Sequence, residues 1–147
     1  MSGIVCAIRG GPSSQPTIQT AIDLAKSTNL TVHFLYVVNI NFLSHTSSSR
    51  VDLVYHEMDR MGEFILLVAQ DKAQAQGVPS DGTVRHGKVG DEIVALGREI
   101  KAEYVVLGQP QSADDKDIFT HDHLQKFKER IEKECNAKVV LAEGAHP

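Results

Sequence analysis

The sequence has no long hydrophobic run, few cysteines and no tryptophan, and these shortages exclude several classes of protein. Its 147 residues include two cysteines, and aromatic residues make up 5%. No apolar stretch approaches the roughly 20 residues that a membrane-spanning helix needs. The N-terminus MSGIVCAIRGG lacks the basic and long apolar regions of a signal peptide. These absences favour a cytoplasmic protein without a membrane segment.

Positive charge is also in short supply. The sequence has 15 lysine and arginine residues and 19 acidic residues, so its net charge is −4. Such a chain has no general affinity for nucleic acid or anionic membranes. Cys6 lies in the first apolar run and Cys135 at the polar end of a late helix. In a reducing compartment we expect neither a disulfide between them nor a metal site.

What the sequence does contain is a regular alternation of short apolar runs and helical stretches. Five runs predict strands: GIVCAIR, TVHFLYVV, SDGTVRHG, AEYVVLG and AKVVLAEG. TVHFLYVV does not alternate, which indicates burial on both faces, whereas the polar SDGTVRHG suits a sheet edge. The order β-α-β-α-β-α-β-α-β predicts one α/β domain, residues 1–147, with an open parallel sheet and helices on both faces.

The stretches between the strands have apolar residues at helical spacing. Ser13 or Ser14 can cap the first helix, and its inward residues are predicted to be Ile18, Ala21, Ile22 and Ala25. The second helix covers about residues 51–76 and ends at Gly77. Its predicted inward residues are Leu53, Met61, Phe64, Ile65, Val68 and Ala69. The last two helices are predicted to bury Ile93, Val94, Leu96 and Ile100, and Leu124, Phe127 and Ile131.

A ligand of such a sheet binds at the carboxyl ends of the strands, where the strand order reverses. Three loops lie there: RGGPSS, VNINF and GQPQSADD. The third continues into an acidic loop with two histidines, whose polar residues are Asp114, Asp115, Asp117, His121, Asp122 and His123. Their spacing fits neither a helical histidine pair nor a calcium loop. We therefore predict no metal site and favour a solvated loop that caps the next helix.

Nearly the whole chain resembles the universal stress protein family. GIVCAIRGGPSSQPTIQTAIDLAKSTNLTVHFLYVV resembles the family's first strand, helix and second strand, and GVPSDGTVRHGKVGDEIVALGREIKAEYVVLGQ resembles its middle. The resemblance implies a Rossmann-like fold, related to the adenine-nucleotide alpha hydrolases, with five parallel strands in the order 3-2-1-4-5. It also implies a role in stress response and a homodimer through the last strand. The dimer residues here are Lys138, Val139, Val140, Leu141 and Ala142.

The sequence departs from the nucleotide-binding branch of that family. Those members have an Asp at the end of strand one and a loop G-x2-G-x9-G-(S/T) after strand four. Here Arg9 replaces the Asp, and Gly108 keeps the first glycine, but Gln111, His121 and Asp122 replace the later residues. Side chains fill a cradle that glycines would leave open. A carboxylate about 5 Å from a phosphate charge costs roughly 3 kcal/mol at an effective dielectric near 20. We therefore predict a degenerate phosphate loop and no cofactor.

The residues predicted to line this degenerate nucleotide pocket are Arg9, Gly10, Val38, Leu107, Gly108 and Gln109. Arg9 lies beside a helix N-terminus, a position that favours an anion, but an ion pair with an Asp of the acidic loop is favoured. The main prediction is a non-catalytic, dimeric binding or regulatory module with an unidentified protein partner and no nucleic-acid or membrane partner. The alternative is a switch that holds AMP or ATP in an altered pose, with adenosine near Val38, Leu107 and Gly108.

Two other classes fit less well. RGGPSS faintly resembles the SGGxDS loop of ATP pyrophosphatases, but Arg9 and Ser13 replace its Ser and its Asp. A Gly-Gly turn followed by a serine helix cap explains the stretch more simply. A receiver domain needs an acidic pair after strand one, whereas this strand ends Ile8-Arg9. We therefore exclude a receiver domain, and we interpret RGGPSS as a structural turn and not as the loop of an ATP pyrophosphatase.

Overall fold

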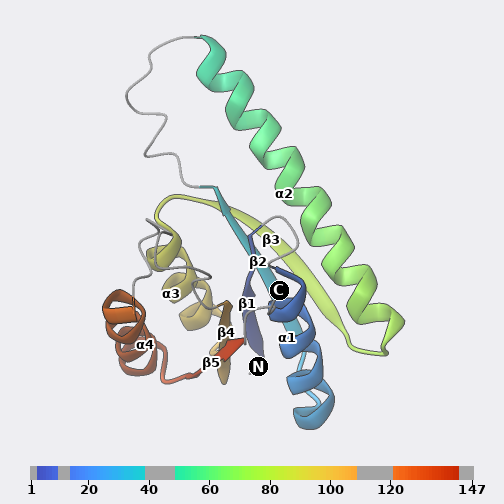
Figure 1. The fold of residues 1–147 in the computed structure, drawn as a ribbon, viewed down its shortest axis with the longest axis vertical. Helices are drawn as coiled ribbons and strands as arrows, with labels where there is room; N and C mark the ends of the chain where they lie inside the picture. Colours follow the sequence, from blue (N-terminus) through green and yellow to red (C-terminus); the bar gives the residue numbers. More distant parts are fainter. Residues whose placement is uncertain (1–2, 10–13, 39–48, 109–120, 143–147) are drawn as a thin grey trace.

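The computed structural model describes residues 3–9, 14–38, 49–108 and 121–142. Strands and helices alternate through these ranges, as the sequence predicts (Figure 1). The elements are β1 Ile4–Ala7, α1 Ser14–Thr28, β2 Val32–Val38, α2 Ser49–Ala75, β3 Ser80–His86, α3 Val89–Glu99, β4 Tyr104–Gly108, α4 His121–Cys135 and β5 Lys138–Ala142. None of the helices in these ranges is both long and apolar enough to cross a membrane.

The strands form one parallel sheet in the order β3-β2-β1-β4-β5, which confirms the predicted order and places β3 and β5 at the edges. All five strands begin on the same rung, meaning one row of paired residues across the sheet. Ile4 pairs with Val32 and Tyr104, and these pair with Ser80 and Lys138. The amino edge of the sheet is therefore level.

The carboxyl edge, in contrast, is stepped. β1 ends at Ala7, which pairs with Leu35, whereas β2 continues for three more rungs to Val38. At about 3.3 Å per residue, the step between these two neighbours is about 10 Å. β4 is intermediate: counted from the Cys6–Val106 pair, Gly108 is level with Ile8. The central strand is thus the shortest in the sheet.

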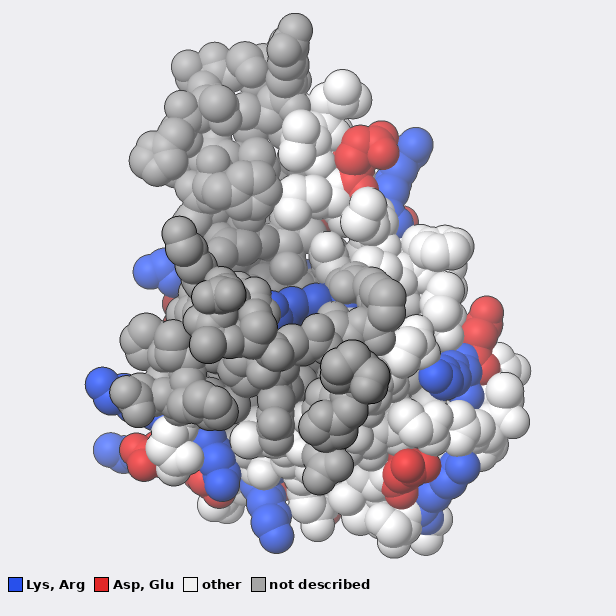
Figure 2. Space-filling model, viewed as in Figure 1, with Lys and Arg blue, Asp and Glu red and all other residues white. Residues whose placement is uncertain are grey.

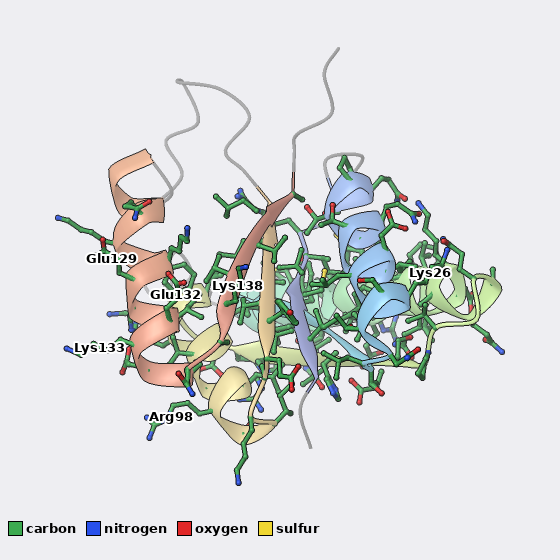
Figure 3. All side chains as sticks on the ribbon, turned by 90° about the horizontal axis from the view of Figure 1, so that it is seen from below. Lys26, Arg98, Glu129, Glu132, Lys133 and Lys138 are labelled. Carbon is green, nitrogen blue, oxygen red and sulfur yellow. The ribbon has the colours of Figure 1, made fainter. Side chains whose placement is uncertain are left out.

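Helices cover both faces of the sheet. α1 and α2 lie on one face and α3 and α4 on the other; Figure 3 shows α1, marked by Lys26, and α4, marked by Glu129 and Lys133, on opposite sides of the strands. Successive strand residues point to opposite faces. Phe34 accordingly packs with α1 and α2, and Leu35 packs with α3 and α4, both fully buried. TVHFLYVV is therefore buried on both faces, as predicted.

The predicted inward face of α2 is wrong in part. Ala69 is buried and Ile65 packs against the core, but Leu53, Met61, Phe64 and Val68 are 63%, 59%, 67% and 41% exposed. Among the α2 side chains that the structure describes, those of Leu66, Ala69 and Ala73 are buried, as is Gly62. Most of them are small.

Close packing of α2 on the sheet explains that choice. A Cβ atom on Gly62 would lie 2.6 Å from Cδ1 of Tyr36 in β2. A Cβ atom on Gly82 in β3 would lie 3.0 Å from Cβ of Leu66 in α2. Because the helix and strands approach so closely at these points, α2 buries mostly small residues there, with Leu66 as the large exception, and Met61, Phe64 and Val68 point outward.

The other helices bury the residues that their spacing predicts, with one exception. The four predicted positions of α1 are buried, as are Ile93, Val94 and Leu96 in α3 and Phe127 and Ile131 in α4. Ile100 packs on the core but follows the last residue of α3, and the side chain of residue 124 lies outside the described set. Gly77 ends α2 as predicted, with a φ of 75°.

Candidate functional site

The carboxyl ends of β1 and β4 are the point where the strand order reverses, and ligands of open α/β sheets bind at such a point. Arg9 follows β1, and Leu107 and Gly108 end β4, so the structure brings these three predicted residues to one place. Val38 ends β2 at the same edge, two strand spacings or about 10 Å from β4. Gly10 and Gln109, with the acidic loop through residue 120, lie outside the described residues.

Gly108 lies against helix α1. A Cβ atom at this position would lie 2.9 Å from Oγ1 of Thr17, whose side chain is buried. Real Cβ contacts are essentially never that short. The glycine that resembles the start of a phosphate loop is therefore required by helix packing, whatever the following loop binds.

Ser14 joins the start of α1 to the end of β1. Its Oγ donates a hydrogen bond to the backbone carbonyl of Arg9, and its side chain is buried. The other predicted capping residue, Ser13, lies outside the described residues, so which serine caps α1 stays a prediction. The Arg9 backbone is held in place by this bond, while its side chain is exposed.

Val38 ends β2 inside the protein core. Its side chain is fully buried, and its carbonyl accepts a 3.0 Å hydrogen bond from the N–H of Gly87. That bond closes the turn after β3 against the end of β2. With its side chain fully buried and its carbonyl bound to Gly87, Val38 supports this edge from within.

Three side-chain pairs at or near the same edge were not predicted from the sequence. Nε2 of His86, at the end of β3, lies 2.5 Å from Oδ1 of Asp59 in α2. Arg85 pairs with Glu99 and, at 3.7 Å, with Glu92 of α3. The partners are far apart in the chain, so no local spacing signals them. These pairs fasten α2 and α3 to the edge strand β3.

The two thiols are unsuited to nucleophilic chemistry. Burial raises the pKa of Cys6, and burial followed by the charge of Glu134 raises the pKa of Cys135. The Cys135 thiol donates to the carbonyl of Val94 at 3.4 Å. Both cysteines are free and remain protonated near neutral pH. Among the described residues, no group of three or more His, Cys, Asp or Glu side chains could hold a metal ion.

A hollow of ≈450 Å³ lies at the opposite, amino edge of the sheet, beside the ends of α3 and α4 (Arg98 in Figure 3). Its lining residues are Arg98, Lys101, Ala102, Glu103, Glu134, Cys135 and Asn136. The hollow is open and mixes both signs of charge. Because it lies away from the switch point, we keep the carboxyl edge as the candidate site.

Solved structures with the same fold come from several organisms. A universal stress family protein from Burkholderia pseudomallei is 19% identical, with a TM-score of 0.70 over 95% of this chain and 94% of that one. One from Archaeoglobus fulgidus, described in complex with dAMP, is 13% identical, with a TM-score of 0.62 over 97% and 98%. One from Arabidopsis thaliana, described with AMP bound, is 13% identical, with a TM-score of 0.61 over 97% and 92%.

At these identities the structural matches establish the fold alone. The comparison with curated protein sequences found no match. The comparison with family models is more informative, because the model of the universal stress protein family matches residues 1–139, nearly the whole sequence. The chain therefore belongs to the universal stress protein family.

Proposed function

We propose that the chain is a cytoplasmic, non-catalytic binding module of the stress response that does not bind ATP through the family's phosphate loop. The observation that supports this most directly is Arg9 at the end of β1, at the switch point. The nucleotide-binding branch implied by the resemblance has an acid there, which can accept hydrogen bonds from ribose. A guanidinium only donates, so it cannot take over that role.

Gly108 adds to the argument. It is the one glycine of the family's loop pattern that this chain keeps, and its contact with Thr17 explains it without a phosphate. The later positions of the pattern hold Gln111, His121 and Asp122. In the proposed function, the protein uses the carboxyl edge of its sheet to recognise a partner or a small ligand other than ATP.

We also propose that two copies associate through β5. β5 is an edge strand, and the backbone groups on its outer side can pair with another strand. Val139 and Ala142 are buried within one copy, Val140 and Leu141 are half-buried, and Lys138 is exposed at the strand's start (Figure 3). A two-fold partner would continue the sheet across both copies.

Native mass spectrometry of the freshly purified protein, followed by calorimetric titration with ATP at millimolar magnesium, tests the nucleotide proposal. We expect no co-purified nucleotide and no ATP binding below about 1 mM. In Arg9→Ala we expect any change in melting temperature to be the same with and without ATP, and Arg98→Ala at the amino edge is the matched control. A micromolar ATP affinity would contradict the proposal.

Hydrogen exchange tests the β5 dimer. If the outer backbone groups of β5 pair with a partner, its amide protons exchange more slowly at about 100 µM protein than at about 1 µM. The same comparison for β1, which lies inside the sheet, is the control. Equal exchange of β5 at both concentrations, with a monomer mass, would contradict the dimer.

A second candidate is a nucleotide-dependent switch that binds AMP in an altered pose. It is favoured by the two solved structures of this fold that are described with AMP and dAMP. A monophosphate places less charge near an acidic loop than a triphosphate does. The same titration with AMP separates the candidates: micromolar affinity for AMP that Arg9→Ala weakens at least tenfold supports the switch.

A further inference from the structure

Helix α2 runs antiparallel to the strands that it covers, and its contacts show which turn lies above which rung. A Cβ atom on Gly82 in β3 would lie 3.0 Å from Cβ of Leu66. Four residues earlier in α2, Gly62 lies against Tyr36, which is two rungs nearer the carboxyl edge of the sheet. Four helix residues rise about 6 Å and two rungs span about 6.6 Å, so helix and strands stay level with each other.

The last rung of β2 and β3 lies beneath Asp59 of α2. Nε2 of His86 lies 2.5 Å from Oδ1 of Asp59, and His86 pairs with Val38 on that last rung. The first ten residues of α2, Ser49–Met58, therefore project past these two strands by about 15 Å (Figure 1). This segment is called the α2 arm below.

The α2 arm buries none of its described side chains. Leu53, Val54, His56 and Glu57 are exposed, and Met58 is half-buried. Figure 2 shows that α2 forms the outer surface on this side, where acidic and basic groups lie among uncharged ones. An isolated helix shorter than about 12–15 residues is only marginally stable in water. The arm therefore gains little stability either from burial or from its own length.

The other half of α2 is held on two sides. Its side chains Leu66, Ala69 and Ala73 are buried in the core. Gln76, directly after the helix, exchanges two hydrogen bonds with Gln19 of α1, at 3.1 and 3.2 Å. Local stability within a protein follows the number of buried contacts. The helix thus joins a firmly held half to a weakly held arm, and the boundary lies at the last rung of the sheet.

We propose that the α2 arm folds and unfolds separately from the rest of the protein, and that the Asp59–His86 pair is the latch that stops this opening at the last rung. The pair ties the first packed turn of α2 to the end of β3, so an open arm leaves Gly62 and the turns after it in place. The order–disorder change of one segment is a recurrent form of conformational switch. This one acts at the carboxyl edge of the sheet and leaves the core folded.

Native-state hydrogen exchange of the full chain tests the separate opening. Each helical N–H bonds to the carbonyl four residues earlier, so the amides of residues 53–62 report the α2 arm and those of residues 66–73 report the packed half. After correction for intrinsic exchange rates, we expect the arm amides to be at least about 100-fold less protected than the packed ones. A smaller difference, as would result if another chain covered the arm, overturns the proposal.

Asp59→Ala and His86→Ala test the latch in the same experiment. Alanine is the better helix former, so Asp59→Ala would slow exchange in α2 if propensity alone decided. We expect instead at least about fivefold faster exchange of amides 63–65, which bond to the carbonyls of residues 59–61. The double variant should exchange no faster than either single variant, because both residues act through one contact.

The matched control is Asp71→Ala, the same change at an exposed position of the packed half. It should leave amides 63–65 unchanged. The latch is disproved by a smaller effect in either single variant, by additive effects in the double variant, or by an equal effect of Asp71→Ala.

One proline in each half of α2 gives an independent test by thermal unfolding. Val54 and Leu67 are both exposed apolar residues of the helix, and a proline inside a helix removes a hydrogen bond and clashes with the preceding turn. Val54→Pro should lower the Tm by less than about 4 °C, because the arm already opens on its own. Leu67→Pro should lower it by more than that or prevent folding. The separate arm is contradicted if Val54→Pro reaches this loss or if Leu67→Pro does not.

Discussion

At the scale of single residues, glycine is required at two positions because a neighbouring side chain leaves no room for a Cβ atom, and not because of its own backbone conformation. Gly108 and Gly62 lie where a methyl group would collide with Thr17 and Tyr36, respectively. Neither has a positive φ, whereas Gly77 and Gly87 do. Replacing Gly108 or Gly62 therefore tests packing, and the neighbouring residue can be changed to relieve the collision.

We predict that Gly108→Ala lowers the free energy of unfolding by about 1–2 kcal/mol, because its Cβ would be forced against Oγ1 of Thr17. Urea denaturation measures the loss. In a Thr17→Ala background, where the oxygen is gone, the same change should cost less than about 0.5 kcal/mol. Equal losses in both backgrounds would show that the Thr17 contact is not the reason for the glycine.

Sequence identified Gly108 as a strand end and a possible ligand position, but it could not identify Thr17 as its neighbour. The two residues meet only after β4 has joined the sheet beside β1 and α1 has folded over both. Ser14 shows the same limit: its place at the helix start was predictable, whereas its bond to the Arg9 carbonyl depends on the path of the intervening loop. Pairs of residues distant in sequence are set by tertiary structure.

At the scale of secondary-structure elements, α2 shows how a helix with two apolar sides misleads sequence analysis. Both sides satisfy helical periodicity, and the larger residues suggested the buried one. The structure confirms Ala69 but buries Gly62, Leu66 and Ala73 in place of most of the larger predicted residues, because α2 lies close to β2 and β3. Periodicity gives the spacing of a buried face, but the distance between packed elements decides which face fits.

We predict that Gly62→Ala destabilises the protein even though alanine is the better helix former by about 1 kcal/mol. The new Cβ would lie 2.6 Å from the Tyr36 ring, and such overpacking costs about 1–3 kcal/mol. Thermal unfolding measures the net loss. Combined with Tyr36→Leu, which removes the ring, Gly62→Ala should become stabilising. A stabilised single variant would contradict the close approach of α2 and β2.

At the scale of the whole molecule, the sequence predicted the order of elements, the parallel sheet and its strand order. These follow from alternating periodicities and, for the strand order, from the family resemblance, and the structure confirms them. The oligomer and the ligand are not set in this way. They depend on surfaces such as the outer edge of β5, whose exposure appears only once the chain has folded.

Stability of the whole domain should fall in alkaline solution because of Cys6. Burial raises the pKa of its thiol, so above pH 9 the unfolded chain loses a proton that the folded protein keeps. A raised folded pKa leaves stability intact at lower pH and removes it as the pH rises. We predict a loss of about 1.4 kcal/mol between pH 8 and pH 10 by urea denaturation.

The control for this prediction is Cys6→Ala, which cannot titrate. The variant is less stable at pH 8, because a small cavity replaces the sulfur. Between pH 8 and pH 10, however, its free energy of unfolding should fall by about 1.4 kcal/mol less than that of the wild type. The raised pKa of Tyr36, also caused by burial, lowers the stability of both proteins at still higher pH. Parallel pH curves for the two proteins would rule out Cys6 as the cause.

The level start of the five strands has a consequence for how this fold can diversify. With every strand anchored on one common row, residues can be inserted or deleted beyond the strand tips without shifting any pair in the interior. The tips after β1 and β4 are where Arg9 and Gly108 lie. The loops after the strand tips can therefore change in length and sequence during evolution while the pairing of the strands below them stays the same.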